Sequence, residues 1–231
     1  MPLPSIIAID GSAASGKSAV GKRLAARLDY LFYDTGVLYR AATFLALRAF
    51  GSLADADQVS MLALQTHFEI LAPTVNDGRD CTVTADLEDI TLGLRRPEVE
   101  ANVSPVSAMP RVRRILTAQM RKAGLRGRVV MVGRDVGTVI LPEAQLKIYL
   151  TASVEARAQR RFAEAQARRD TRGESRSYDD ILANLRERDH IDSTRATAPL
   201  RAADDAVRLD TTHLDLEGVV AEIEQLLKSK T

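Results

Sequence analysis

The sequence predicts an α/β protein with a five-stranded parallel sheet flanked by helices. Two observations support this fold class. Short apolar runs alternate with longer helical patterns along the 231 residues, and the runs are mostly apolar on both faces, as strands buried in a parallel sheet are. Strands that alternate with helices are joined by right-handed crossovers, which place the helices against the sheet.

The expected elements follow one another along the chain. We expect strands over Ile6–Ile9, Leu31–Tyr33, Val129–Val132, Leu146–Leu150 and Ala206–Leu209. We expect helices over Lys17–Leu28, Val37–Phe50, Pro110–Ala123, Ser153–Arg168, Tyr178–Arg188 and Leu216–Lys228. The last helix repeats apolar residues at positions 216, 219, 220, 223, 226 and 227, which share one helical face.

Residues 63–103 break this alternation. The runs "FEIL" and "CTVTADLEDI" resemble short strands on either side of a turn at "NDGRD". We therefore expect a small β-rich insert over 63–103, carried by a core made of 1–62 and 104–231. A second segment, roughly 157–190, is dense in arginine. It predicts either solvated helix or a flap that faces phosphate.

Composition excludes several functional classes. The net charge of +1 gives no general attraction to nucleic acid or membranes, and no apolar run approaches the roughly 20 residues of a spanning helix. The N-terminus lacks the basic region of a signal peptide. A single cysteine, Cys81, suits a reducing compartment, and with only three scattered histidines beside it the sequence predicts no zinc site. We expect a cytoplasmic monomer that binds neither nucleic acid nor membrane.

The stretch "GSAASGKS", residues 11–18, follows the first expected strand and opens the first helix. This Gly-x-x-x-x-Gly-Lys-Ser pattern is a phosphate-binding loop, whose amides point at an anion at the positive end of the helix dipole. Gly11 and Gly16 allow the tight turn, Lys17 supplies a charge for the β- and γ-phosphates, and the Ser18 hydroxyl suits Mg²⁺. The alternative is a glycine-rich turn that binds nothing. The pattern is specific for a phosphate ligand and not for a reaction.

Three other classes of protein share such a loop. A GTPase switch would carry Asn-Lys-x-Asp, which the sequence lacks. A nucleic-acid-dependent ATPase would carry a basic stripe on a larger chain. A nucleotide-binding regulator would have the loop without a second, arginine-lined site, so the presence of that second site discriminates.

Three further stretches supply candidates for the second site. In "YDTGVLYR", Asp34 is either a magnesium ligand or a helix cap, Thr35 can act as a cap, and Arg40 reaches an anion or forms a surface salt bridge. In "VGRDVGTV", Arg134 and Asp135 follow a strand and bind a ligand or form an ion pair with each other. In "RERDHIDSTRATAPL", the residues Arg188, Asp192 and Arg195 project from one helical face, as a site or as a salt-bridged surface.

Together with "MPRVRR" and "GRDVGTVILPEAQLKIYL", these stretches resemble the bacterial cytidylate kinases, over Ile6 to about Leu227. The resemblance implies a P-loop kinase fold with a nucleotide-binding insert and an arginine-bearing lid at about 157–176. It implies ATP-dependent phosphorylation of CMP and dCMP with Mg²⁺. The alternative is a P-loop kinase for UMP or another small acceptor, such as AMP or shikimate.

The resemblance also implies roles for individual residues. Cytosine would be read by Ser104, Arg113 and Asp135, although Ser104 could instead cap a helix. The CMP phosphate would be held by Arg40, Arg134 and Arg188, with Thr35 nearby, and the sugar by Asp192 and Arg195. ATP would lie on Gly11, Ser12, Ala13, Ala14, Ser15, Gly16, Lys17 and Ser18, approached by Arg157, Arg160 and Arg161. Catalysis would rest on charge neutralisation by Lys17, Arg134 and Arg188, with Ser18 and Asp34 at the metal and no general base.

Two stretches depart from the family pattern. Relatives commonly have glycine where this loop has Ala14, so a Cβ must be accommodated there. Ile191 and Ser193 stand where relatives can have arginine, which reduces the positive charge near the acceptor phosphate.

Overall fold

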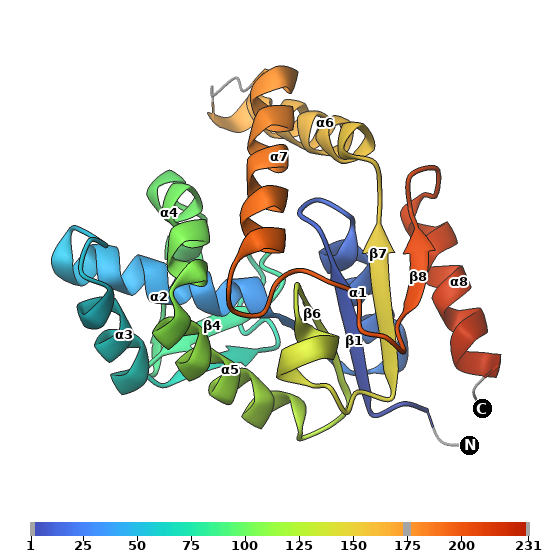
Figure 1. Cartoon of the computed structure of the whole chain (residues 1–231), viewed down its shortest axis with the longest axis horizontal. Helices are drawn as coiled ribbons and strands as arrows, with labels where there is room; N and C mark the ends of the chain where they lie inside the picture. Colours follow the sequence, from blue (N-terminus) through green and yellow to red (C-terminus); the bar gives the residue numbers. More distant parts are fainter. Residues whose placement is uncertain (1–2, 173–176, 230–231) are drawn as a thin grey trace.

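A five-stranded parallel sheet forms the centre of the protein, in the order β2-β6-β1-β7-β8 (Figure 1). The computed structural model describes residues 3–172 and 177–229. The strands are β1 (Ile6–Gly11), β2 (Leu31–Asp34), β6 (Val129–Gly133), β7 (Leu146–Thr151) and β8 (Val207–Asp210). Every neighbouring pair is parallel, so the carboxyl ends of all five strands meet at one edge. In an open α/β sheet this edge is where ligands bind.

Alternate residues of the central strand β1 point into two separate hydrophobic clusters. Ile7 and Ile9 pack against α1 (Lys17–Leu28) and α8 (Leu216–Ser229) on one face. Ile6 and Ala8 point to the other face, toward α2 (Thr35–Phe50) and α5 (Pro110–Gly124). All six residues of β1 are buried, which explains why this strand is apolar on both faces.

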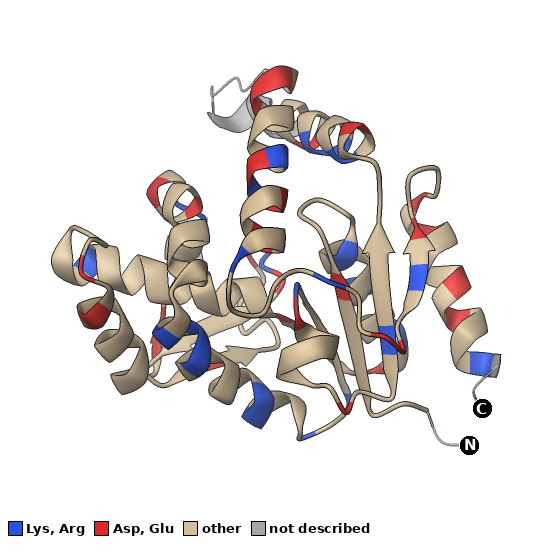
Figure 2. Ribbon diagram, viewed as in Figure 1, with Lys and Arg blue, Asp and Glu red and all other residues tan. Residues whose placement is uncertain are grey.

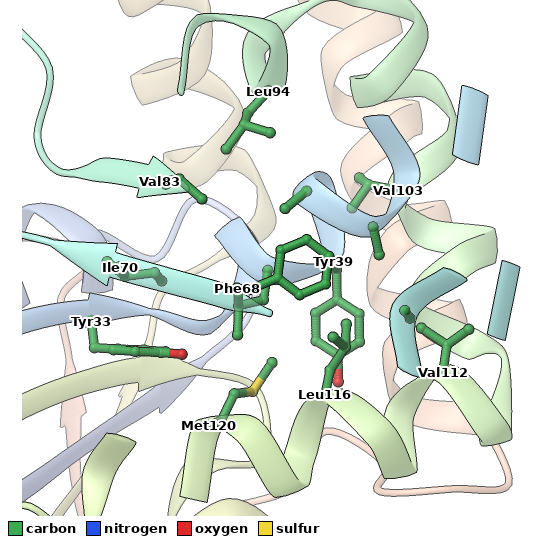
Figure 3. Packing of buried hydrophobic residues seen from close by; sticks show 14 of the residues in the cluster. Tyr33, Tyr39, Phe68, Ile70, Val83, Leu94, Val103, Val112, Leu116 and Met120 are labelled. Atoms are coloured by element: carbon green, nitrogen blue, oxygen red, sulfur yellow. The ribbon is translucent and has the colours of Figure 1, made fainter. Parts of the chain in front are cut away.

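The second cluster continues into a small antiparallel sheet. This sheet consists of β3 (Phe68–Leu71), β4 (Thr82–Ala85) and β5 (Glu88–Asp89), followed by the 3₁₀ helix η1 (Thr91–Arg95). Phe68 and Ile70 of the small sheet belong to the same hydrophobic cluster as Leu116 and Met120 of α5 (Figure 3). The two sheets therefore share one hydrophobic core.

Helices α6 (Val154–Arg172) and α7 (Tyr178–Thr194) lie beyond the carboxyl edge of the main sheet (Figure 1). They pack on each other through a third cluster, which includes Ala158, Ile181 and Leu185 and also Ala13 of the phosphate loop. The hydroxyl of Ser177 accepts a hydrogen bond from the Asp180 amide at 3.0 Å and caps α7.

The structure confirms the predicted fold class and all five predicted strands, each within two residues at either end. The sequence did not predict α3 (Ala56–Gln65) or α4 (Pro97–Ala108). The predicted insert limits, 63 and 103, fall inside these two helices, and the division into core and insert stays a prediction. Of the predicted lid, 157–176, the part over 173–176 lies outside the described residues.

None of the helices in the described ranges combines the length and the apolar character that crossing a bilayer requires.

Candidate active site

A cleft opens at the carboxyl edge of the sheet, between the phosphate loop and α7. Its wall is contributed by the loop itself, the start of α2, α4, α5, the segment after β6, α6 and α7. Figure 2 shows basic and acidic residues along α7 where it descends toward this edge. The cleft therefore brings together side chains that are up to about 180 positions apart in the chain, from Ala13 to Arg195.

The phosphate loop is held in its turn by its own backbone and by Lys17. The Lys17 ammonium is buried and donates a hydrogen bond to the Ser12 carbonyl at 2.9 Å. Burial, reinforced by the nearby Arg134, lowers the pKa of Lys17 well below its usual value. At Gly11 a Cβ would lie 2.4 Å from the Leu150 carbonyl oxygen, so only glycine fits. Bound phosphates would provide this buried ammonium with a partner of opposite charge.

Ala14 adopts a left-handed backbone conformation, with φ of 60°. Only glycine reaches this region without steric cost, since a Cβ approaches the following carbonyl oxygen. This explains physically why a glycine is favoured at this position in such loops. In this chain the Ala14 methyl packs against the third cluster, between the loop and helices α6 and α7.

Ser18 and Asp34 lie side by side at the start of the cleft. The Ser18 hydroxyl donates to Asp34 Oδ2 at 2.8 Å, while Asp34 Oδ1 accepts the Gly36 amide at 2.9 Å and caps α2. The cap predicted as one alternative for Asp34 is thus confirmed, and its second oxygen still faces Ser18. No group of three or more His, Cys, Asp or Glu side chains within the described residues could hold a metal alone. Two oxygens completed by phosphates and water fit Mg²⁺.

The far end of the cleft carries a chain of alternating charges. Arg113 pairs with Asp135, and both side chains are nearly fully buried. Arg195 lies 3.6 Å from Asp135 and 3.5 Å from Asp192, and Arg134 Nε donates to Asp192 at 2.7 Å. We call these five residues the ion-pair chain. The alternative that Arg134 and Asp135 pair with each other is wrong, because Arg134 pairs with Asp192 and Asp135 pairs with Arg113.

Arg40 and Arg188 also line the cleft, close to Arg134. Burial, followed by the charges of Arg134 and Arg40, lowers the pKa of Arg188 to about 10. The alternative that Arg40 forms a surface salt bridge is wrong within the described part of the chain, where it has no acidic partner within 4.0 Å. Three guanidiniums that cluster in one cleft, with the pKa of Arg188 depressed among them, are typical of an anion-binding site.

Ser104 and Thr35 both line the cleft. Ser104 lies inside α4, so the alternative that it caps a helix is wrong; α4 begins at Pro97. Thr35 does not cap α2 either, since Asp34 does; its hydroxyl donates to the Val132 carbonyl at 2.9 Å. This bond ties the start of α2 to the end of β6.

The sequence alone did not single out Tyr39 and Ser107, which also line the cleft. The Arg113 guanidinium lies 5.3 Å from the centre of the Tyr39 ring, and Arg113 Nη1 donates to the Ser107 carbonyl at 3.0 Å. Burial raises the pKa of Tyr39 to about 12. Both residues hold Arg113 in place. Tyr39 lies inside the stretch "YDTGVLYR", which was the available signal, whereas Ser107 acts through its backbone carbonyl and carried no signal in the sequence.

Asp10 is a further residue that the sequence did not single out. Its buried carboxylate accepts the amides of Val136 and Gly137, at 2.8 and 2.7 Å. Burial raises the pKa of Asp10 to about 6. The carboxylate fixes the segment that carries Arg134 and Asp135, and a charged residue ending an apolar strand was the available signal.

The three arginines expected in the lid differ in position. Arg160 and Arg161 line the cleft. Arg157 is 5% exposed and is not part of the cleft wall; it contacts the phosphate loop from the outside. Gly11, Ser12 and Ser15 are likewise not part of the cleft wall; the Ser12 carbonyl accepts hydrogen bonds from Lys17 and from the Ser15 amide, which shape the loop.

This fold and this cleft define a P-loop kinase in which a second group of arginines lies in the same cleft as the phosphate loop. The family model described as cytidylate kinase matches residues 7–229. The chain is 54% identical to the cytidylate kinase of Herpetosiphon aurantiacus, over 84% of this chain and 82% of that protein. It is 43% identical to that of Streptococcus agalactiae serotype V, over 95% and 93%. The chain belongs to the cytidylate kinase family.

Among solved structures, an uncharacterized protein from Eubacterium ventriosum is similar in fold, with a TM-score of 0.50 and 12% identity over 97% of this chain and 98% of that one.

Proposed function

We propose that this enzyme transfers the γ-phosphoryl group of ATP to CMP and dCMP, giving CDP and dCDP. The observation that carries the proposal is the buried Arg113–Asp135 pair, which lies in the same cleft as Lys17 of the phosphate loop. The family assignment supports the same activity.

The base-reading proposal follows from the chemistry of cytosine. The exocyclic amino group is a donor and suits the Asp135 carboxylate, while the ring nitrogen and carbonyl oxygen accept from Arg113 and Ser104. Uracil presents a carbonyl in place of the amino group, which a carboxylate repels. A buried mismatch of this kind costs about 1–3 kcal/mol, which corresponds to about 5- to 150-fold.

Arg40, Arg134 and Arg188 would hold the acceptor phosphate, and Asp192 with Arg195 the sugar. A phosphate monoester with a second pKa near 6 is already a dianion at neutral pH, so no general base is needed. The acceptor oxygen attacks the γ-phosphorus in line, and the arginines with Lys17 neutralise the transferred charge. Ser18 and Asp34 would hold Mg²⁺, which screens the β- and γ-phosphates when bound. Arg160 and Arg161 would approach ATP from α6.

A substrate panel tests the proposal. Purified protein with Mg-ATP is assayed for ADP release with CMP, dCMP, UMP, AMP and GMP. We expect efficient use of CMP and dCMP, use of UMP that is lower by about 5- to 150-fold, and negligible use of purine nucleotides. Equal rates with UMP would refute the role given to Asp135. A regulator without enzymatic activity would bind ATP and release no ADP with any acceptor.

The substitution Asp135→Asn tests the base-reading pair within the folded protein. Asparagine retains the shape and one acceptor for Arg113, whereas alanine would leave a buried guanidinium unpaired at about 3–5 kcal/mol. We expect a higher KM for CMP and a smaller preference over UMP, with the KM for ATP unchanged. A loss of ATP binding in a folded variant would make Asp135 a structural residue.

A further inference from the structure

The Arg157 side chain joins three segments that are distant in the sequence. Its Nε donates to the Ala152 carbonyl at 3.1 Å, and Nη1 donates to the Ala13 carbonyl at 3.1 Å. The terminal nitrogens also hold both carboxylate oxygens of Asp189, at 3.1 and 2.6 Å. One planar guanidinium on α6 thus connects the backbone of the phosphate loop to α7. Such bidentate pairs fix orientation as well as distance.

Both ends of this connection adjoin residues of the cleft. Ala13 is followed by Ala14, which lines the cleft beside Lys17. Asp189 directly follows Arg188, one of the three clustered arginines, on the helix that also carries Asp192. The Arg157 side chain therefore connects the Ala13 carbonyl directly to α7, the helix that lines the acceptor end.

Apolar packing reinforces the same connection. Ala13 belongs to the third cluster with Ala158 of α6 and with Ile181 and Leu185 of α7. This cluster is separate from the two clusters that cover the main sheet. The phosphate loop thus packs against the α6–α7 pair.

We infer that Arg157 is a positioning residue that couples the two ends of the cleft, so that ATP on the phosphate loop strengthens the binding of CMP. By thermodynamic reciprocity, CMP then strengthens the binding of ATP by the same factor. The inference rests on the proposed function, because it takes CMP as the ligand of the acceptor end. It gives Arg157 a role that is distinct from direct contact with ATP.

Isothermal titration calorimetry tests the coupling. The Kd of CMP is measured with and without a saturating non-hydrolysable ATP analogue and Mg²⁺. In the wild-type protein we expect at least about 5-fold tighter binding with the analogue, the lower end of typical coupling. In Arg157→Lys and in Asp189→Asn we expect the ratio to fall below about 2-fold, because neither variant can form the bidentate pair.

The pair Arg186–Glu155 provides a matched control. It links the same two helices, at 3.4 Å, without contacting the phosphate loop. Glu155→Gln should keep the wild-type ratio. Thermal unfolding of each variant separates a general loss of stability from a loss of coupling.

Several outcomes would overturn the inference. One is a wild-type ratio below 2-fold; another is a wild-type ratio retained by both Arg157→Lys and Asp189→Asn. Weaker binding of the analogue alone in Arg157→Lys, with Asp189→Asn unaffected, would make Arg157 a direct ATP ligand instead. If Arg157→Lys does not fold, Asp189→Asn decides, since the Asp189 side chain is 28% exposed. If the substrate panel identifies another nucleotide, the same cycle is run with it, so the two failures are distinguishable.

Discussion

The two ends of the cleft are built in different ways. The phosphate loop is shaped by its backbone: Gly11 and Gly16 allow the turn, and Lys17 is held by the Ser12 carbonyl. The acceptor end is shaped by side chains, through the ion-pair chain of Arg113, Asp135, Arg195, Asp192 and Arg134. A backbone site recognises any phosphate, whereas a side-chain site distinguishes one acceptor from another. We therefore expect specificity within this common fold to reside at the acceptor end.

The largest expected effect follows from the loss of Lys17 in the phosphate loop. Lys17→Met removes the charge while filling the buried space, so the protein should fold. We expect kcat to fall by roughly 10³-fold, the upper range for losing one transition-state donor, with CMP affinity nearly unchanged. Steady-state kinetics and calorimetry measure both. Lys22→Met, on the exposed side of α1, is the control and should keep wild-type kcat. Retained activity in Lys17→Met would refute this role.

The next effect concerns Asp10, which holds the segment after β6 through the amides of Val136 and Gly137. Its pKa is raised to about 6 in the folded protein from an ordinary 3.8, mainly by burial. Protonation of Asp10 therefore stabilises the folded state below about pH 4, and this contribution is lost as the pH rises through about 6. Relative to Asp10→Asn, we expect the free energy of unfolding of the wild-type protein to decrease by about 3 kcal/mol between pH 4 and 7.

Urea unfolding at a series of pH values measures this difference. Asp29→Asn, whose side chain is 97% exposed, is the control and should leave the pH dependence of stability nearly unchanged. A parallel pair of curves for the wild-type protein and Asp10→Asn would contradict the prediction.

The third prediction concerns Arg188, which lies near two other positive charges at the acceptor end. Arg188→Met should lower kcat/KM for CMP by roughly 100-fold, through the lost phosphate contact, and leave KM for ATP unchanged. The same variant should unfold at an equal or higher temperature, since a half-buried charge near Arg134 and Arg40 is removed. Arg186→Met, on the exposed side of α7, should change neither quantity. A lower unfolding temperature would show that Arg188 stabilises the fold.

The smallest expected effect lies at Ala14. Ala14→Gly removes the steric cost of a φ of 60° and should stabilise the protein by up to about 1 kcal/mol. Ala13→Gly, at a position without a positive φ, should instead destabilise it by about 0.5–1 kcal/mol. Chemical denaturation compares the two. If Ala14→Gly destabilises as much as Ala13→Gly, packing of the methyl in the third cluster outweighs the backbone strain.

The main sheet could be predicted because its strands are apolar on both faces, a pattern that local sequence reveals. Helix α4 could not, since Pro97 and Pro105 are typical of a break, although Pro97 occupies the first turn and Pro105 lies within the helix. Helix α3 is too short for the spacing of its apolar residues to reveal a helical period. Tertiary packing against α2 and α5 determines both.

The phosphate loop could be predicted from eight consecutive letters, because its function is local. The acceptor residues were expected only through a resemblance, since their partners lie far apart in the chain. Asp10 bonds to residues 126 and 127 positions away, and Arg157 bonds to a carbonyl 144 positions away. No spacing rule reveals such contacts, so the partners of Arg134 and Asp135 required the fold.

The three hydrophobic clusters also predict which parts of the protein unfold together in local unfolding. Because the small antiparallel sheet shares its cluster with Ile6, Ala8 and Met131 of the main sheet, the two sheets should lose their amide protection together in hydrogen exchange. The third cluster, between the phosphate loop and helices α6 and α7, contains only four buried members among the described residues, two of them alanines. We therefore expect the described parts of α6 and α7 to lose their amide protection at a lower free energy of opening than the two sheets.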